Sequence, residues 1–363
     1  MLNKQIFVSY GEQAKKMTKE LLEKIDLKAE LKKDDLIALK PNLVNASSSE
    51  KGATTDPQIA AALIEYLINK GFEKLIIIEG SWVGADTDNA FLKCGYQELA
   101  AKYEIPLYNL QKSSYKQKKV LDMEIEIAEI ALKVDYLINL PVLKGHCQTN
   151  ITCALKNLKG CLSDQEKRRF HRIGLHKSIA YLNKALKQDL IIVDGIYGDL
   201  DFEEGGNAVK MNRILAAKDP VLVDSYAAEL LGYHISEIPY LQIAAEIGVG
   251  NNNLDKAEII EMNKDQAADI NYNSSKIEQL TKKIKAKNAC SACYGSLIHA
   301  LKRLAERGKL KRINQAIYLG QAYQAKEIAG LGIGNCCNQA AEFVKGCPPS
   351  AKEIIDFLND QNM

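Results

Sequence analysis

The sequence lacks an apolar segment long enough to cross a bilayer, and it lacks an excess of charge of either sign. Apolar runs such as Leu75–Ile78 are far shorter than the roughly 20 residues that a transmembrane helix needs. The first residues, Met1–Val8, contain no apolar core of signal-peptide length. The formal net charge is only +2, which excludes a strong field over the whole molecule. We therefore expect a cytoplasmic protein that does not bind membranes.

Several catalytic motifs are also missing. The sequence contains no GxxxxGK[ST] phosphate loop, no GxSxG nucleophile elbow and no HExxH zinc motif. The phosphate-loop, α/β-hydrolase and zincin classes therefore lose their main support. The basic segments carry no interleaved aromatic residues, which argues against a nucleic-acid partner.

Short apolar runs alternate with longer helical patterns over the first two-thirds of the chain. The expected strands each end at a polar, Gly or Pro residue, and they are Leu36–Leu39, Lys74–Glu79, Tyr136–Leu140, Leu190–Asp194 and Arg213–Ala217. The expected helices are Pro57–Asn69, Asp88–Tyr103, Lys177–Leu186 and Pro220–Leu231. This alternation predicts an α/β fold with a largely parallel sheet and helices on both faces. Ligands of such folds bind at the carboxyl edge, where the parallel strands end.

A polar stretch rich in Asn, Asp and Ser, Asn263–Ser275, predicts a linker. We place the domain boundary there, with an α/β domain at 1–270 and a small cysteine-bearing α/β domain at 271–363. The elements expected in the second domain are a basic helix at Lys276–Lys287, a helix at Ser296–Arg307, a strand at Gln315–Leu319 and a helix from Ala351.

Four cysteines of the second domain have the pattern of a metal site. Nine cysteines in a reducing compartment are poor candidates for disulfides, and an odd number cannot all pair. Cys290 and Cys293 stand about one helical turn apart, so both thiolates can reach one centre. Cys336 follows a glycine-rich segment, and Cys347 precedes Pro348, as the last cysteine of many ferredoxin ligand runs does. This pattern predicts a [4Fe–4S] cluster on Cys290, Cys293, Cys336 and Cys347.

Other interpretations of these cysteines stay open. A CxxC pair alone is also typical of a zinc half-site or a redox dithiol, so zinc is the alternative metal. The step of 43 residues from Cys293 to Cys336 is not ferredoxin spacing. Cys337 competes with Cys336 for the third position. The remaining cysteines stand singly in apolar or α/β contexts, where a free cysteine is usually a small buried hydrophobe.

The cysteine-rich region is also the basic region. From Thr281 to Met363 there are 13 Lys and Arg against 6 Asp and Glu, a local charge of +7. These cations would offset the negative charge of a thiolate-ligated cluster. They would also attract an acidic electron-transfer partner such as a ferredoxin or flavodoxin, while a solvated helix face is the simpler interpretation.

Positive and polar side chains gather after the strand expected at Tyr136–Leu140. The loop that follows runs into a helix, whose dipole would favour a phosphate or carboxylate. A second group of such residues follows the neighbouring strand Leu36–Leu39. The expected residues of this anion site are Lys40, Asn42, Lys144, Thr149, Lys156, Asn157 and Lys159.

Two residues near this edge are candidates for proton transfer in catalysis. They are His146, which lies in the loop, and Asp194, which ends the strand Leu190–Asp194. Asp219 precedes Pro220 and is more simply interpreted as a helix cap. The basic segment Lys167–His171 is expected to be a loop that could act as a lid.

Several motifs together resemble the domain-of-unknown-function 362 family. They are Lys40–Leu43, Thr55–Pro57, Glu79–Gly80, Asn139–His146, Ala154–Gly160, Asp194–Gly195 and Asp219–Asp224, and they span most of the chain. The tail resembles the variant of this family with a [4Fe–4S] module, whose CxxC, GxGNC and GCPP elements match Cys290, Cys293, Cys336 and Cys347 and leave Cys337 unused. Members are described as iron–sulfur proteins of unsettled activity. The N-terminal domain is also similar in layout to the family of the nickel-pincer lactate racemase, which implies a small hydroxy-acid or cofactor substrate near Lys144 and His146.

We therefore expect a redox-active iron–sulfur protein, an oxidoreductase that exchanges electrons with an anionic small molecule, a bound cofactor or a partner protein. The alternative is a non-redox isomerase or transferase that acts on a phosphate or carboxylate and holds a structural metal. The metal content of the purified protein distinguishes the two.

Overall fold

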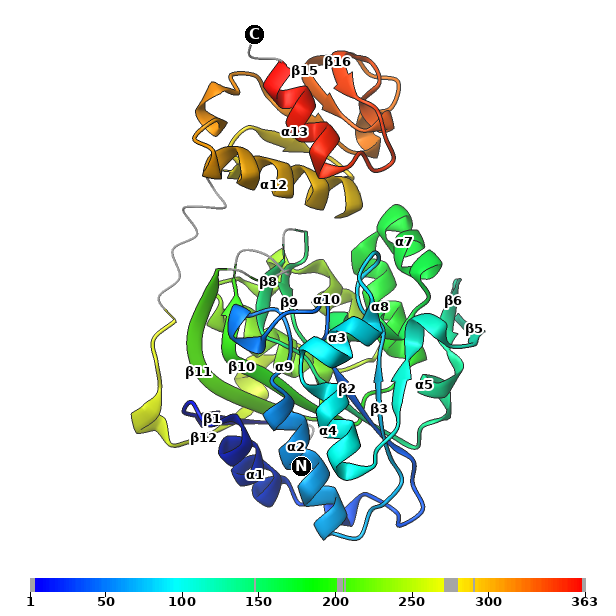
Figure 1. Ribbon diagram of the computed structural model, residues 1–363, viewed down its shortest axis with the longest axis vertical. Helices are drawn as coiled ribbons and strands as arrows, with labels where there is room; N and C mark the ends of the chain where they lie inside the picture. Colours follow the sequence, from blue (N-terminus) through cyan, green and yellow to red (C-terminus); the bar gives the residue numbers. More distant parts are fainter. Residues whose placement is uncertain are drawn as a thin grey trace. The chain divides into compact units, whose positions relative to one another are not determined.

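The computed structural model describes residues 4–146, 148–200, 205, 207–270, 280–289 and 291–360. The chain divides into two compact units, which are residues 1–170 with 176–272, and residues 171–175 with 273–363 (Figure 1). We call them the large unit and the small unit and describe each by itself. The exact domain boundary expected at residue 270 stays a prediction. Cys290 and residues 276–279 of the expected basic helix lie outside the described residues.

An eight-stranded sheet forms the centre of the large unit, in the order β12-β1-β11-β10-β7-β2-β3-β4. Its strands are β1 Gln5–Tyr10, β2 Ile37–Pro41, β3 Leu75–Glu79, β4 Leu107–Asn109, β7 Tyr136–Leu140, β10 Leu190–Asp199, β11 Ala208–Ala217 and β12 Glu258–Met262. Every neighbouring pair is parallel except the two pairs that β11 makes, with β1 and with β10. All five expected strands are present, and the prediction of a largely parallel sheet is confirmed.

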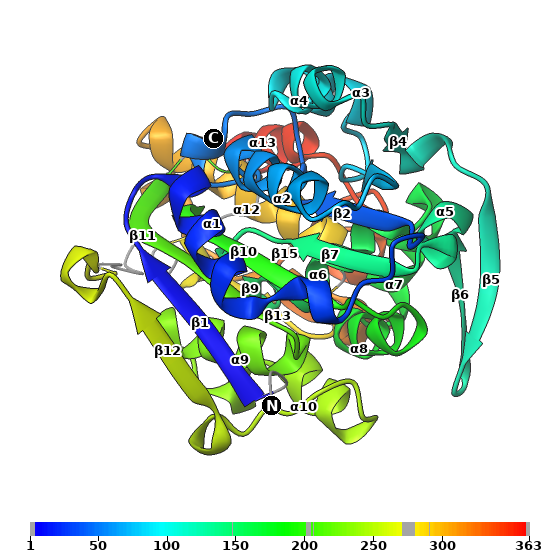
Figure 2. The same cartoon turned by 90° about the horizontal axis from the view of Figure 1, so that it is seen from below.

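Helices cover both faces of this sheet (Figure 2). On one face α1 (Ala14–Ile25), α2 (Pro57–Asn69) and α4 (Tyr96–Tyr103) bury apolar side chains against the strands. Helix α2 begins where Asp56 accepts a hydrogen bond from Gln58 N and Pro57 takes the first position. On the other face lie α6 (Ala154–Asn157), α8 (Leu175–Ala185), α9 (Pro220–Leu230) and α10 (Pro239–Glu246). The prediction of helices on both faces is therefore confirmed.

Shorter elements complete the large unit. Two antiparallel hairpins form, β5 with β6 and β8 with β9. The bounds are α3 Thr87–Lys93, β5 Tyr115–Val120, β6 Met123–Ala128, α5 Glu129–Lys133, β8 Lys144–His146, β9 Asn150–Thr152 and α7 Asp164–Ile173. No helix in the described part of the chain is long and apolar enough to span a membrane.

Three local predictions for the large unit are wrong. The single helix expected at Asp88–Tyr103 is two helices, because the chain takes a left-handed turn at Gly95 with φ of 79°. The loop expected at Lys167–His171 is part of α7. Strand β11 was expected to end at the carboxyl edge with the other strands, but it runs antiparallel. The residues that follow it therefore lie at the opposite edge from the ends of β2, β7 and β10.

The small unit contains a four-stranded, fully parallel sheet in the order β13-β14-β15-β16. Helices α12 and α13 pack on each other and contribute buried leucines and isoleucines, among them Leu301 and Ile354. The expected helix at Lys276–Lys287 is wrong over Ile284–Ala286, which pair with β14 as a strand. The bounds are β13 Ile284–Ala286, α12 Ser291–Glu306, β14 Ile317–Leu319, β15 Ile328–Ile333, β16 Ala340–Val344 and α13 Ala351–Asp360.

Candidate functional site

A continuous chain of hydrogen bonds runs along the face of the large sheet that α6 and α8 cover. Each side chain donates to the side-chain oxygen of the next, from Lys144 through Asn42, Asn157, Asn139 and Gln188 to Asn183. The five donor–acceptor distances are 2.8, 2.7, 2.7, 2.6 and 2.7 Å. Asn183 ends the series by donating to the Leu155 carbonyl oxygen at 2.8 Å. We call these six side chains the amide chain.

The amide chain joins elements that are far apart in the sequence. Asn42 is half-buried and the other five members are buried, so their polar groups need partners within the protein, and neighbouring members supply one another. An unsatisfied buried polar group costs about 1–3 kcal/mol. Three expected anion-binding residues, Asn42, Lys144 and Asn157, therefore bind one another. The missed member Asn139 had a signal in the sequence, because it interrupts the apolar strand Tyr136–Leu140.

Lys40 forms a buried ion pair with Glu79. Lys40 Nζ lies 2.8 Å from Glu79 Oε2, and the two side chains are 0% and 3% exposed. A Cβ atom at Gly160 would lie 2.6 Å from Lys40 Nζ and 2.4 Å from Glu79 Oε1, so only glycine lets the chain close over this pair. Sequence reasoning missed Glu79 as the partner, although a carboxylate that ends an apolar strand needs one.

Lys167 adds a second buried cation beside this pair. Its Nζ donates to the Ser81 carbonyl oxygen at 2.7 Å and lies 3.3 Å from Asp164 Oδ1. Burial lowers the pKa of Lys167. Helix α7 thus places Lys167 at the carboxyl edge, although the sequence had suggested that this residue belongs to a lid loop.

His146 lies at the end of β8 and is 5% exposed. Its Nδ1 accepts hydrogen bonds from Gln148 N and Thr149 N, both at 3.1 Å. A neutral ring therefore carries its proton on Nε2. Thr149 Oγ1 donates to the Ile151 carbonyl oxygen at 2.9 Å, within the same hairpin. The hairpin fixes the orientation of the His146 ring through the backbone.

Asp224 of α9 occupies the start of helix α6. Its Oδ1 accepts from Ala154 N at 2.7 Å and its Oδ2 from Leu155 N at 3.1 Å. The N–H groups that we expected to attract an anion are thus already bound to a carboxyl group of the protein. Lys156 is buried on α6, and Lys159 is half-buried just beyond it.

The expected catalytic residue Asp194 lies within β10 and is 2% exposed. Its Oδ2 accepts from Asp56 N at 2.8 Å and its Oδ1 from Ile196 N at 3.1 Å. Burial raises the pKa of Asp194 to about 7 and the pKa of Asp224 to about 7. Carboxyl groups with such values exchange protons near neutral pH, as general acids and bases must.

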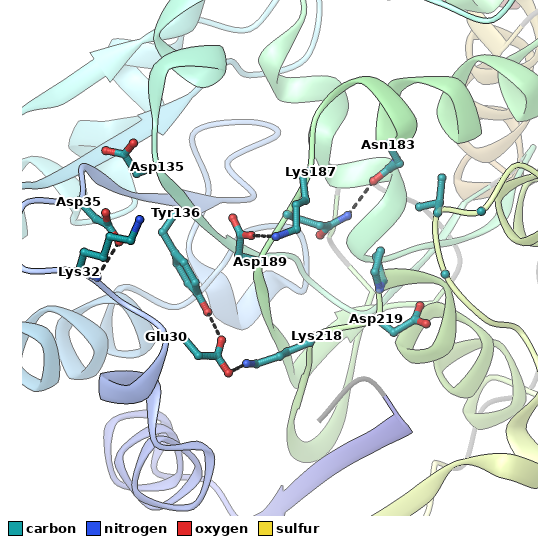
Figure 3. A pocket seen from close by; sticks show the side chains of 15 residues that line it. Glu30, Lys32, Asp35, Asp135, Tyr136, Asn183, Lys187, Asp189, Lys218 and Asp219 are labelled. Carbon is teal, nitrogen blue, oxygen red and sulfur yellow. Dashed lines mark hydrogen bonds and ion pairs between the residues drawn. The ribbon is translucent and has the colours of Figure 1, made fainter. Parts of the chain in front are cut away.

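The opposite edge of the sheet contains a polar cavity of about 720 Å³ (Figure 3). Asp219 lies in its wall because it follows the antiparallel strand β11, and it caps α9 by accepting from Val221 N and Leu222 N. The capping interpretation of Asp219 is thus confirmed. Glu30 binds Lys218 in the same wall. Gln188 and Asn183 of the amide chain also line this cavity.

The cysteine segments of the small unit follow strands of its parallel sheet. Cys293 lies in α12, after β13, while Cys336 follows β15 and Cys347 follows β16. Parallel strands end at the same edge, so these three segments leave the sheet together. A Cβ atom at Gly334 would lie 3.3 Å from Cys293 Sγ and 3.3 Å from the Gly346 carbonyl oxygen. Glycine at position 334 therefore lets the three segments approach one another closely.

Asn335 joins the segments of Cys336 and Cys347. Its backbone N donates to the Gly346 carbonyl oxygen at 2.9 Å, and its Oδ1 accepts from Gly346 N at 2.9 Å. Two hydrogen bonds between the same two residues fix the separation of the loops. The distance between the two cysteine segments is thus set by a residue beside Cys336.

The adjacent residues Cys336 and Cys337 lie in different surroundings. Cys337 is 0% exposed and packs against Ile328 and Ala340, and burial raises the pKa of its thiol. Cys336 is half-exposed, and its Sγ accepts a hydrogen bond from Gln324 Nε2 at 3.6 Å. Cys336 is therefore better suited than Cys337 to bind a metal at the sheet edge.

The described cysteines form no disulfide. Among the residues that the structure describes, no three Cys, His, Asp or Glu side chains are grouped so that they could hold a metal ion. Cys290 lies outside these residues. The four-cysteine site thus stays a prediction.

Replacing Asn157 by Leu should destabilise the large unit by about 2–6 kcal/mol. The change removes the donor to Asn139 Oδ1 and the acceptor of Asn42 Nδ2, each a loss of about 1–3 kcal/mol. Urea unfolding followed by the fluorescence of Trp82, the single tryptophan, measures the loss. Asn69→Ala, at an exposed position at the end of α2, is the control. Equal losses in the two variants would contradict a special role of the amide chain.

The contribution of Asp194 and Asp224 to the stability of the large unit should fall as pH rises from about 4 to 7. The folded protein holds protons on Asp194 and Asp224 up to a pKa of about 7, whereas an unfolded Asp releases its proton near pH 4. The stabilisation is thus fully present below the pKa of the unfolded state. It is lost as pH rises through the pKa of the folded state. The free energy of unfolding of the wild type, minus that of Asp194→Asn, should decrease by up to about 1.4 kcal/mol per pH unit. Asp34→Asn, with an Asp side chain that is 91% exposed, should show no such pH dependence.

Comparison with known proteins identifies a family whose model matches this chain. A family model described as "Domain of unknown function (DUF362)" matches residues 37–229. A thylakoid-associated protein of Synechocystis is 26% identical over 235 residues, which cover 60% of this chain and 70% of that protein. The lactate racemase apoprotein of Thermoanaerobacterium thermosaccharolyticum gives a TM-score of 0.41 at 13% identity, over 64% of this chain and 57% of the racemase. A Thermotoga maritima protein gives 0.41 at 14% identity, over 65% of this chain and 60% of that protein. Because the family model covers more than half of its residues, the chain belongs to the DUF362 family.

Proposed function

We propose that this protein holds a [4Fe–4S] cluster on Cys290, Cys293, Cys336 and Cys347 and exchanges single electrons through it. The observation that carries the proposal is the common origin of the cysteine segments at one edge of a parallel sheet. Four thiols are the ligand set that such clusters use, and backbone N–H groups of the glycine-rich loop can approach the cluster sulfurs. When bound, the cluster would supply one-electron chemistry.

The residues of the small unit would hold the ligands in place. Asn335 and Gly346 fix the loops of Cys336 and Cys347, while the Gly334 position lets Cys293 come close to both. Cys337 contributes packing to the small core rather than ligation. The proposal also requires reducing conditions, which keep thiols free, and the cytoplasm supplies them.

The partner in electron exchange is an acidic protein of the ferredoxin or flavodoxin kind. The small unit carries exposed cations on β13 and close before the CxxC pair, including Lys282, Lys285 and Lys287. Positive charge near the ligands would offset the charge of the cluster and steer a negative partner toward it. The rate of exchange should then fall steeply as salt is raised.

The large unit would bind an anionic small molecule at its carboxyl edge. Lys156, which is buried on α6, and Lys159, which is half-buried just beyond it, are the cations that we assign to this anion. His146 would hold the exchangeable proton on Nε2, because its Nδ1 already accepts two backbone hydrogen bonds. The other expected residues would then hold the site together through their contacts with protein groups rather than contact the anion. They are Lys40, Asn42, Lys144, Thr149 and Asn157.

The adjacent cysteines give a matched test of the cluster. Anaerobically purified wild-type protein should contain about four iron and four sulfide per chain, with absorbance near 400 nm that dithionite bleaches. Cys336→Ala should lose most of this iron because it removes a ligand. Cys337→Ala should keep the iron and lose only packing energy, about 1–3 kcal/mol.

Other outcomes would reject the cluster. Zinc in place of iron, in a colourless protein, would favour the alternative of an isomerase or transferase with a structural metal. Equal iron in Cys336→Ala and wild type would exclude Cys336 as a ligand. Metal analysis together with electron paramagnetic resonance separates these cases.

Thermal unfolding should detect the anion site. Inorganic phosphate or malonate should raise the melting temperature of the wild type, because a ligand that binds only the folded state stabilises it. Lys159→Ala should lose most of this increase, and Lys16→Ala, at an exposed lysine of α1, should keep it. An increase of the same size in both variants would remove the anion site from the proposal, whatever the metal content.

A further inference from the structure

We propose that Gln324 is a positioning residue that raises the reduction potential of the cluster by donating a hydrogen bond to the sulfur of Cys336. The inference rests on the proposed function, since it requires Cys336 to be a ligand. It adds a residue outside the ligand set that tunes the redox chemistry.

The contact itself is an amide-to-sulfur hydrogen bond. Gln324 Nε2 lies 3.6 Å from Cys336 Sγ. Hydrogen bonds to sulfur are longer than those to oxygen because the sulfur atom is larger. Gln324 directly follows the turn Gln321–Tyr323 (η10), and Cys336 lies in the turn Asn335–Cys337 (η11), which packs against the first turn.

The neighbouring residue Tyr323 anchors the turn that carries Gln324. Its ring meets the ring of Tyr318 edge to face, with centroids 5.3 Å apart and an interplanar angle of 88°. It also packs on the small core of Ile328, Cys337 and Ala340. The backbone is held as well, because Gln324 N donates to the Gln321 carbonyl oxygen at 3.2 Å. The backbone at Gln324 is therefore held, and its exposed side chain reaches Cys336 Sγ from this fixed origin.

Cys337 connects the segment that carries Gln324 to the proposed ligand Cys336. The same small core holds the side chain of Cys337 and the ring of Tyr323, so the chain on both sides of the hydrogen bond is fixed to one apolar cluster. The backbone segments of Gln324 and Cys336 are thus both held by this apolar cluster.

The sign of the effect follows from charge. Reduction adds an electron to a cluster whose sulfurs share the negative charge, and an N–H donor stabilises the more negative state. Loss of the donor should therefore lower the potential. The expected change in the ratio of oxidised to reduced protein at a fixed potential is roughly two- to tenfold, the net effect of one hydrogen bond. A tenfold change corresponds to about 59 mV for a one-electron couple.

The test compares midpoint potentials of the full-length, anaerobically purified protein. Dithionite titration followed by electron paramagnetic resonance gives the potential, and iron analysis gives the cluster content. Gln324→Leu should keep wild-type iron and have a lower potential. Gln324→Asn, whose amide is one methylene further from Cys336, should also have a lower potential. Gln339→Leu, at an exposed position beyond Cys337, should match the wild type in both measurements.

Two results would overturn the inference. In one, both Gln324 variants hold iron and show the wild-type potential, which would leave the cluster itself in place. In the other, both variants lose iron, which would make Gln324 a purely structural residue. If the wild type holds no iron, the proposed function fails first, and metal analysis of the wild type alone identifies that case.

Discussion

Parallel strand pairing is the constraint on which both units depend. In a parallel sheet every strand ends at the same edge, so side chains that are distant in the sequence are brought together by the pairing itself. In the large unit this places Lys40 and Asn42 after β2 beside the residues that follow β7. In the small unit it collects the segments of Cys336 and Cys347 after β15 and β16. The one reversed strand, β11, sends Asp219 to the other edge.

The need to satisfy buried polar groups then decides what each side chain at the edge can do. A lysine after a strand suggests an anion site, yet Lys40 and Lys144 are almost fully buried and are bound to Glu79 and to Asn42. Leaving either ammonium group without a partner would cost far more than a surface ion pair can return. These side chains at the carboxyl edge thus form a network in which protein groups bind one another.

The sequence allowed the fold to be predicted further than the site. Apolar runs that end at polar residues gave the five strands, and Pro57 and Pro220 marked two helix starts. Strand β15 was missed because two glycines lower the strand propensity of Ile328–Ile333, and β13 because a run of lysines suggested a helix face. The amide chain could not be predicted, since Lys144 and Asn42 are 102 residues apart and Asn42 and Asn157 are 115 apart. Spacing along the sequence carries no information on such pairs. In the small unit, by contrast, the joined loops of Cys336 and Cys347 are close in sequence.

The amide chain has a direction, and its ends determine it. An ammonium group has only donors, while the Leu155 carbonyl at the far end has only an acceptor. If one amide between them turned over, two N–H groups would face each other on one side and two oxygens on the other. All five amides would have to rotate together, which the groups at the two ends forbid. The lysine at one end and the backbone carbonyl groups at the other therefore hold the amides of Gln188 and Asn183, which line the cavity at the opposite edge, in one orientation.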